Sequence, residues 1–164
     1  SSDLLLVKEQ GQNTEKKEEV TARVSRLDSI TRKLFGLVYY LEKNQVPGID
    51  ADSLRATITT IAGDEYESIR KSFEPIRDEL LLESEIAHGL LGDKKDVIKK
   101  EIAELLLNFE EDGLRKKFSL LMAELTLSER NKDETRASEL MQKCHAISKR
   151  LSELALTRRN AEEN

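Results

Sequence analysis

The sequence predicts an all-α protein: a small helical bundle, followed by a long connecting helix and a C-terminal antiparallel helical hairpin. The 164 residues include only seven glycines and two prolines, so few positions interrupt a helix. Charged residues make up 36 % and aromatic residues 4 %, a composition that favours long solvated helices over sheets. Apolar residues also recur at alternating spacings of three and four, which is the period of one helix face.

The composition also excludes several classes of protein. The longest apolar run, residues 34–41, is far shorter than the about 20 residues that a membrane-spanning helix needs. With 27 basic against 32 acidic residues, the net charge of −5 argues against strong direct binding of nucleic acid. One cysteine, Cys144, excludes an internal disulfide and fits a reducing, cytoplasmic location.

Residues 1–23 are predicted to hold the end of a preceding domain and a polar linker. Residues 4–7 are apolar, but residues 8–19 are mostly Gln, Asn, Lys and Glu, which bury too little surface to offset the entropy of ordering. A helix that continues into the next element is the alternative to a linker. Because the chain begins without Met or a targeting signal, we expect it to be a piece of a longer protein.

Residues 24–92 are predicted to form the bundle. Its central helix begins near Val24 and ends before Pro47, and one face carries a regular apolar stripe: Leu27, Ile30, Leu34, Leu37 and Leu41. Phe35, Val38, Tyr39 and Tyr40 widen this face.

Three shorter helices of the bundle are marked by their end signals. Asp50 or Asp52 caps the first of them, and Gly63 ends it. Asp64 and Glu67 have the spacing of a capping box for the second. Pro75 suits the first turn of the third, which Gly89 and Gly92 end.

Residues 93–113 are predicted to be the connecting helix, capped by Asp93 and continuous with the first arm of the hairpin. An unbroken helix as far as residue 130 would extend about 55 Å. Gly113 is its only breaker and is expected to kink it. A turn at residues 130–133 then follows, with Asn131 in a left-handed conformation and Asp133 as the next N-cap.

Residues 114–157 are predicted to form the hairpin, and residues 158–164 a frayed tail. The two arms carry facing stripes: Leu114, Phe118, Leu121 and Leu125 on the first arm, and Ala137, Leu140, Cys144, Ile147, Leu151 and Leu154 on the second. Two such stripes joined by a short turn are typical of antiparallel helices that share one apolar seam.

Each motif that could indicate a catalytic or metal site also has a simpler structural explanation. Glu85 and His88 have the E-x-x-H spacing of di-iron bundles, but the second such motif is absent. Cys144 and His145 are adjacent, so on a helix their side chains diverge, and Cys144 belongs to the apolar stripe. Asp50 and Asp52 stand where capping residues belong. No phosphate-binding loop or zinc spacing occurs, and we predict no catalytic residue, cofactor or metal site.

A second apolar line on the hairpin is the remaining signal. Six residues lie off the seam and are candidates for binding a partner: Leu120, Ala123, Leu127, Arg130, Met141 and Leu156. These side chains either pack within the hairpin or against the bundle, or they contact another protein. We favour a partner, because a projecting hairpin has little else to cover them.

Several segments resemble the C-terminal, helicase-binding region of bacterial DNA primase. They are RLDSITRKLFGLVYYLEK at residues 26–43, IAGDEY at 61–66, FEP at 73–75, ESEIAHG at 83–89, LRKKFSLLMAEL at 114–125 and KRLSEL at 149–154. The resemblance covers residues 24–157 and consists of helix lengths and apolar spacing more than of single diagnostic residues.

This resemblance implies a protein-interaction module. In that family the bundle and hairpin dock on the N-terminal domains of the hexameric replicative helicase, which couples primer synthesis to fork unwinding. The family's zinc-binding domain and catalytic core are absent from these residues, so this chain alone would not be an enzyme. We expect a monomer whose hairpin docks through apolar contacts, with Lys116, Arg130 and Arg136 setting orientation.

Two alternatives have different consequences. The hairpin could pair with a second copy of itself, making the protein a self-associating scaffold. The chain could also be a di-iron enzyme built around Glu85 and His88.

Overall fold

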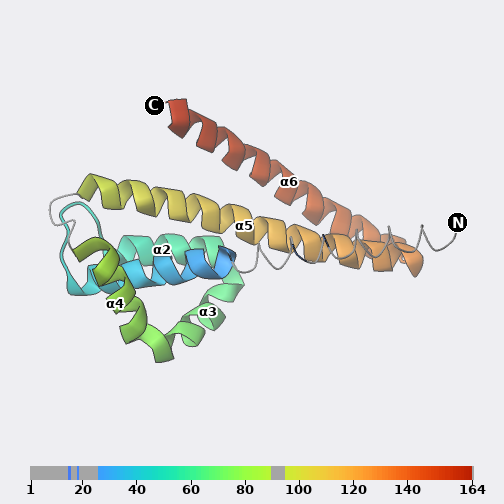
Figure 1. Cartoon of the computed structure of the whole chain (residues 1–164). Coiled ribbons are helices and arrows are strands. Elements are labelled where there is room, and N and C mark those ends of the chain that lie inside the picture. Colours follow the sequence, from blue (N-terminus) through green and yellow to red (C-terminus); the bar gives the residue numbers. More distant parts are fainter. Residues whose placement is uncertain (1–14, 16–17, 19–25, 90–94, 164) are drawn as a thin grey trace, which may run out of the picture.

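The computed structural model describes residues 15, 18, 26–89 and 95–163, and over these residues the protein is all-α and has no β-strand (Figure 1). The first long helix covers residues 26–43. It is followed by α2 (Ala51–Ala62), α3 (Tyr66–Phe73), α4 (Arg77–His88), α5 (Lys95–Arg130) and α6 (Glu134–Glu163). Short 3₁₀ turns, Gly63–Glu65 and Glu74–Ile76, flank α3.

The predicted linker falls almost entirely outside the described residues. Within residues 1–23, only Glu15 and Glu18 are described, and both are helical, as in the alternative to a linker. Gly92 and Asp93, predicted as a helix end and an N-cap, also lie outside the described residues.

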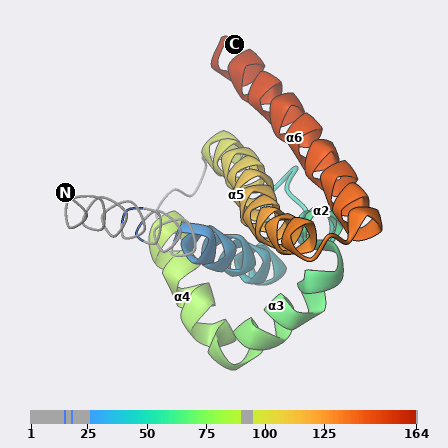
Figure 2. The same cartoon turned by 90° about the vertical axis from the view of Figure 1, so that its right-hand side faces the viewer.

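The helix over residues 26–43 is the centre of the bundle, as its apolar stripe predicted. Figure 2 views the bundle end-on, with α3 and α4 curving around this helix on one side and α5 lying on the other. Leu34 and Leu37 are fully buried, and the widened face is buried as well: Phe35, Val38, Tyr39, Tyr40 and Leu41. Leu54, Ile58, Leu80, Ile98, Leu105 and Phe109 complete this first core.

Gly36 lets α4 approach this central helix at backbone distance. A Cβ atom at this position would lie 2.9 Å from the carbonyl oxygen of Leu80. Glycine in a helix interior costs about 1 kcal/mol relative to alanine. The close packing of α4 therefore explains why a helix breaker lies inside the most buried helix of the protein.

The predicted caps of α2 are confirmed, whereas the predicted capping box is wrong. The Asp50 carboxylate accepts hydrogen bonds from the backbone N–H groups of Asp52 and Ser53, and Gly63 ends α2 with φ +57°. Asp64 lies within a 3₁₀ turn and caps nothing, and Glu67 pairs with Arg70 at 3.1 Å. A cap is not needed there, because the 3₁₀ turn runs directly into α3 and supplies backbone acceptors for its first turn.

Helix α5 has 36 residues and continues unbroken through Gly113. At about 1.5 Å per residue it is about 54 Å long. Its first half packs on the bundle, and its second half extends beyond it together with the first turns of α6 (Figure 1). None of the described helices is both long enough and apolar enough to cross a lipid bilayer.

The turn between α5 and α6 differs by one residue from the prediction. Lys132, not Asn131, has the left-handed backbone, with φ +56°. The Lys132 N–H donates to Glu129 O, and the Asp133 N–H donates to Ser128 O, a pair of bonds that defines a Schellman motif with Lys132 at the left-handed position. Asp133 is the N-cap of α6, as predicted, because its carboxylate accepts from the Arg136 N–H at 3.1 Å.

Replacing Lys132 with glycine is therefore expected to stabilise the hairpin by about 0.5–1 kcal/mol, since glycine adopts positive φ without steric cost. Asn131→Gly is the matched control and is expected to give no gain. Urea unfolding followed by circular dichroism measures both changes. Equal effects of the two substitutions would contradict the assignment of the left-handed residue.

The tail predicted to fray, residues 158–164, is helical as far as Glu163. Arg158 explains this difference. Its guanidinium donates to Asn108 Oδ1 at 2.7 Å and to Glu111 Oε2 at 2.8 Å, which ties the end of α6 to the middle of α5. Apolar periodicity, on which the prediction rested, carries no sign of such a polar contact.

Candidate partner-docking surface

The hairpin has a core of its own, separate from that of the bundle. Its buried members are Leu121, Leu125, Leu140, Cys144 and Ile147, and partly buried members are Leu114, Phe118, Ala137 and Leu151. Every one of these residues belongs to the two predicted stripes. The seam predicted between residues 114–125 and 137–154 is therefore confirmed as far as Leu151, and Leu154 is buried but lies outside this cluster.

Closer to the bundle, ion pairs instead of apolar contacts join α5 and α6. Arg150 binds Glu110 with two bonds, 2.6 Å from Nε to Oε1 and 3.1 Å from Nη2 to Oε2. Arg158 and Arg115 both pair with Glu111. Burial by itself would raise the pKa of Glu111, but the hydrogen bonds and charges of Arg158 and Arg115 together outweigh it and lower this pKa. The carboxylate therefore stays ionised and holds α6 in place.

Asp112 joins the hairpin to the central helix of the bundle. Its side chain is buried, and its Oδ2 atom lies 3.0 Å from Arg26 Nε without a well-aligned hydrogen bond. Burial raises the pKa of Asp112, although the charge of Arg26 acts in the opposite direction. Three consecutive acidic residues of α5, Glu110, Glu111 and Asp112, thus pair with arginines of the central helix, of α6 and of α5 itself.

The six predicted partner-binding residues are all exposed. Leu120 and Leu127 expose 59 % and 58 % of their surface, and Met141 and Leu156 each expose 57 %. Ala123 and Arg130 are exposed too. None of these side chains belongs to either core.

These six residues do not form one surface. Leu120 lies four residues before Glu124, and Leu127 lies three residues after it. Residues at these spacings are neighbours on a helix surface, so all three share one edge of the hairpin. That edge faces Arg136 of α6, which pairs with Glu124 at 3.0 Å.

Met141 lies on the other edge. Its helical neighbour Cys144 contacts Met122 of α5, with 3.9 Å between the two sulfur atoms. Leu156 is about 22 Å farther along α6 than Met141. Met122 exposes 41 % of its surface on this second edge. Sequence periodicity alone did not indicate that Met122 lies there.

We use the name docking line for Leu120, Ala123 and Leu127. Lys116 precedes this line and Arg130 follows it, and both side chains are exposed. Within the described part of the chain neither of them forms an ion pair, whereas Arg136 is engaged by Glu124 and Glu139. The docking line is thus an apolar strip on one helix with an exposed positive charge at each end.

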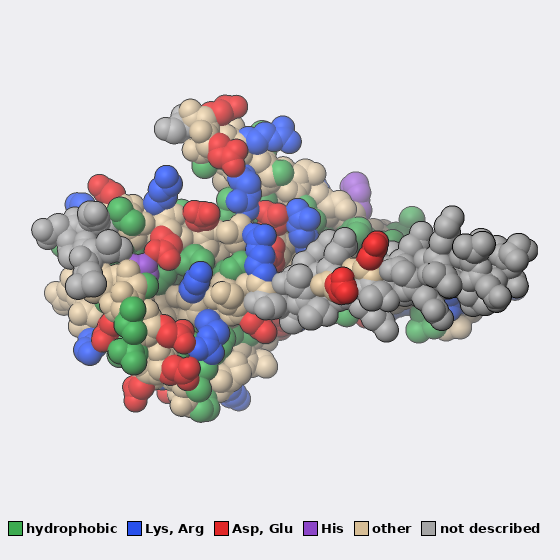
Figure 3. Space-filling model, viewed as in Figure 1, with side chains coloured by type: hydrophobic (Ala, Val, Ile, Leu, Met, Phe, Trp, Pro, Cys, Tyr) green, Lys and Arg blue, Asp and Glu red, His purple; other side chains and the backbone are tan. Residues whose placement is uncertain are grey.

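Other exposed apolar residues lie on the bundle. Leu82 and Ile86 are one turn apart on α4 and, like Met122, were not singled out by the sequence pattern. On the face that Figure 3 shows, acidic and basic side chains are interspersed over the bundle and α6. This distribution fits the small net charge of −5.

Glu85 and His88, the two residues that suggested a di-iron site, contact different partners. Glu85 pairs with Lys43 at 2.9 Å, and the buried His88 places its Nε2 atom 3.6 Å from Glu101 Oε2. Over residues 26–89 and 95–163 no three His, Cys, Asp or Glu side chains gather in a way that could hold a metal ion. Cys144 is buried in the seam, as its place on the stripe predicted.

Comparisons of the chain with protein-family models, with curated proteins and with solved structures found no match.

Proposed function

We propose that this chain is the helicase-binding module of a bacterial DNA primase. In this proposal the hairpin docks on the N-terminal domains of the hexameric replicative helicase and so couples primer synthesis to fork unwinding. The resemblance of residues 24–157 to that region indicates the partner, and one observation supports docking through the hairpin: α5 already uses one face for the seam, yet presents a further line of exposed apolar side chains.

The docking line has the spacing with which a helix binds an apolar groove. Leu120, Ala123 and Leu127 are separated by three and four residues, which are the anchor positions of the helix-in-groove mode. Complete burial of the exposed part of each leucine would contribute about 1–2 kcal/mol. Two leucines alone therefore support weak binding, and neighbouring contacts must raise the affinity.

Lys116 and Arg130 fit this mode as orienting charges. They are about 21 Å apart along α5, one beyond each end of the docking line. Charges at the rim of an interface govern association rate and orientation more than affinity. Acidic groups at the edges of the partner's groove would complement them, and the interaction would weaken as salt concentration rises.

Titration of the labelled chain with the replicative helicase of the same organism tests the proposal. We expect saturable binding at micromolar helicase. The double substitution Leu120→Asp with Leu127→Asp is expected to weaken this binding about a hundredfold, because two carboxylates would have to leave water for an apolar site. Circular dichroism should show unchanged helicity, since both side chains are exposed.

Leu156→Asp is the matched control, because Leu156 is equally exposed but lies away from the docking line. It is expected to leave the affinity within about twofold, the size of effect usual for a surface change. The absence of saturable binding by the folded wild-type chain would refute the proposal. Sedimentation that showed a tight dimer, broken by the double substitution, would support the self-associating scaffold instead.

A further inference from the structure

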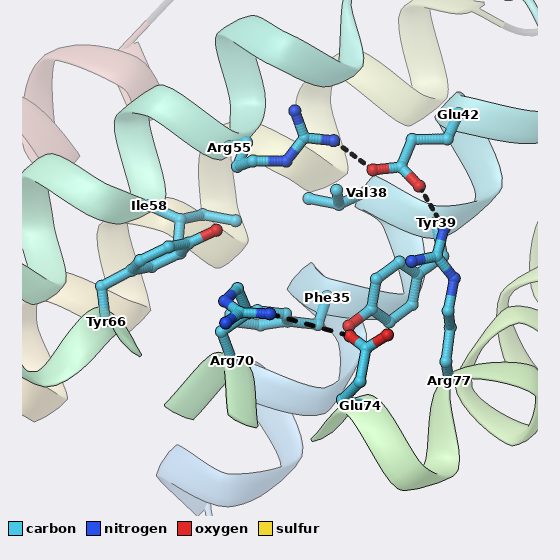
Figure 4. A pocket seen from close by; sticks show the side chains of 10 residues that line it. All are labelled: Phe35, Val38, Tyr39, Glu42, Arg55, Ile58, Tyr66, Arg70, Glu74 and Arg77. Carbon is cyan, nitrogen blue, oxygen red and sulfur yellow. Dashed lines mark hydrogen bonds and ion pairs between the residues drawn. The ribbon is translucent and has the colours of Figure 1, made fainter. Parts of the chain in front are cut away.

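The bundle contains a pocket of about 120 Å³, to which the central helix, α2, α3 and the start of α4 all contribute (Figure 4). The charged groups of its lining already pair with one another. Glu42 accepts hydrogen bonds from Arg55 and Arg77. Arg70 pairs with Glu74, with 4.0 Å between the charged groups. Because a carboxylate engages each of these arginines, the pocket has no surplus of positive charge with which to select an anion.

The hairpin, in contrast, collects all the sulfur atoms of the chain. The sequence contains one cysteine and two methionines. Met122 belongs to α5, and Met141 and Cys144 belong to α6. The Sγ atom of Cys144 lies 3.9 Å from the Sδ atom of Met122. Met141 precedes Cys144 by three residues, so these two side chains are neighbours on the surface of α6.

The alignment of the two helices brings the methionines together as well. Met122 and Met141 each directly follow a buried leucine of the seam, whereas Glu124 and Arg136 each directly precede a seam residue. In two antiparallel helices, the positions that follow the seam meet along one edge, and those that precede it meet along the other. The Glu124–Arg136 pair, at 3.0 Å, marks the second of these edges. Met122 and Met141 therefore meet along the first edge, beside Cys144.

We use the name sulfur cluster for Met122, Met141 and Cys144. The two methionines expose 41 % and 57 % of their surface, whereas Cys144 lies deeper, in the seam, with 8 % exposed. No Lys or Arg stands three or four residues from either methionine, so no basic side chain beside them on their own helices repels a cation. The sulfur cluster thus offers three donor atoms at a place that an ion can enter from water.

The spacing and the chemistry of these donors fit a soft metal ion. A sulfur ligand lies about 2.3 Å from a bound ion such as Zn²⁺, and two sulfur ligands at a tetrahedral angle are then about 3.8 Å apart. The observed 3.9 Å between Cys144 and Met122 is close to this value. Thiolate and thioether groups are soft ligands that favour Cu(I), whereas Mg²⁺ and Ca²⁺ require oxygen ligands.

We propose that the sulfur cluster binds one Cu(I) ion, which joins α5 to α6 along this edge of the hairpin. Cys144 coordinates as a thiolate, so its Sγ atom gives up its proton to water as the sulfur–copper bond forms. The Sδ atoms of Met122 and Met141 each donate a lone pair and complete the ligand set. No electron is transferred in this step.

The filled site is electrically neutral, because the thiolate carries one negative charge and the ion one positive charge. Neutrality matters here, since an uncompensated charge would be costly beside the apolar seam. The docking line runs along the opposite edge of the hairpin, so this site does not depend on the proposed function. Copper binding and helicase binding are therefore tested separately.

Titration of the reduced chain with Cu(I), in the absence of oxygen and in competition with a Cu(I) chelator, tests the proposal. We expect one equivalent of Cu(I) to bind and about one proton to be released. The melting temperature should rise, because the ion binds only the folded hairpin. The NMR signals of the methyl groups of Met122 and Met141 should shift over the same equivalent.

Two variants distinguish the sulfur cluster from a single reactive thiol. The double substitution Met122→Leu with Met141→Leu keeps the cysteine and nearly keeps the side-chain volumes. It is expected to weaken Cu(I) binding at least about a hundredfold, more than the loss of an outer-shell group usually costs. Cys144→Ala is expected to weaken it at least as much. Circular dichroism should show that the double variant keeps its helicity, since both methionines are exposed.

His145→Ala is the matched control, because His145 is the adjacent metal-binding side chain but diverges from Cys144 on the helix. It is expected to leave the Cu(I) affinity within about twofold. The proposal is overturned if the chelator keeps all the copper, if the methionine signals do not shift, or if the double variant binds Cu(I) as tightly as the wild type. A larger loss in His145→Ala than in the double variant would also overturn it and would assign the ion to Cys144 and His145.

Discussion

Leu140→Ala is expected to destabilise the hairpin by about 2–5 kcal/mol, the cost of deleting a completely buried leucine from a packed core. Leu140 is fully buried in the seam, where it packs with Leu121 and Leu125. The hairpin core is small, so little surrounding structure can collapse into the cavity. Thermal and urea unfolding followed by circular dichroism measure the loss.

The neighbouring substitution Met141→Ala is the control for Leu140→Ala. Met141 exposes 57 % of its surface, so its truncation should change the free energy of unfolding by no more than about 0.5 kcal/mol. Because the bundle core is separate, hydrogen exchange of residues 26–89 should change little in Leu140→Ala. Similar losses for both substitutions would contradict the seam as described.

Gly36→Ala is expected to destabilise the bundle by about 1–3 kcal/mol, although alanine is the better helix former by about 1 kcal/mol. The added Cβ would lie 2.9 Å from Leu80 O, closer than real Cβ contacts allow. That oxygen belongs to the backbone of α4, so it can move away only if the whole helix shifts. Equilibrium unfolding in urea gives the change in stability.

Gly113→Ala is the matched control, because Gly113 also lies inside a helix but a Cβ there would have no atom within 4 Å. This substitution is expected to stabilise the protein by up to about 1 kcal/mol, the full difference in helix propensity. The two glycine substitutions should therefore act in opposite directions. A gain in stability from Gly36→Ala would show that α4 does not pack at backbone distance.

The helices and their buried faces followed from local patterns. The stripe through Leu34 and Leu37 and the seam around Leu140 are repeats of three and four residues, which a single helix displays without its neighbours. Helix-end signals such as Asp50 and Gly63 act within one turn, so they too could be recognised from the sequence alone. The prediction of an all-α chain rests on these short-range features.

The remaining features depend on contacts between distant parts of the chain. Gly36 looks like a helix breaker until the backbone of α4 is placed against it. The helical end of α6 depends on Arg158 reaching α5, about 50 residues earlier in the sequence. Neither contact leaves a periodic signal.

The candidate docking surface could likewise be predicted only in part, because it depends on how two helices are aligned. Periodicity predicted that Leu120 and Met141 lie off the seam, but not that they lie on opposite edges of the hairpin. The edge is decided by the register of the two helices, which the Glu124–Arg136 pair and the Cys144–Met122 contact identify. The pocket at Tyr39 and Arg70 needed four helices to be assembled before its residues came together.

Hydroxyl-radical footprinting of the chain saturated with replicative helicase tests the docking line most directly, because it reports the solvent exposure of individual side chains. Leu120 and Leu127 should lose most of their labelling in the complex, whereas Leu82, Ile86 and Leu156, which are about as exposed or more so in the free chain, should keep theirs. Undiminished labelling of Leu120 and Leu127 in a saturated complex would contradict docking through this line.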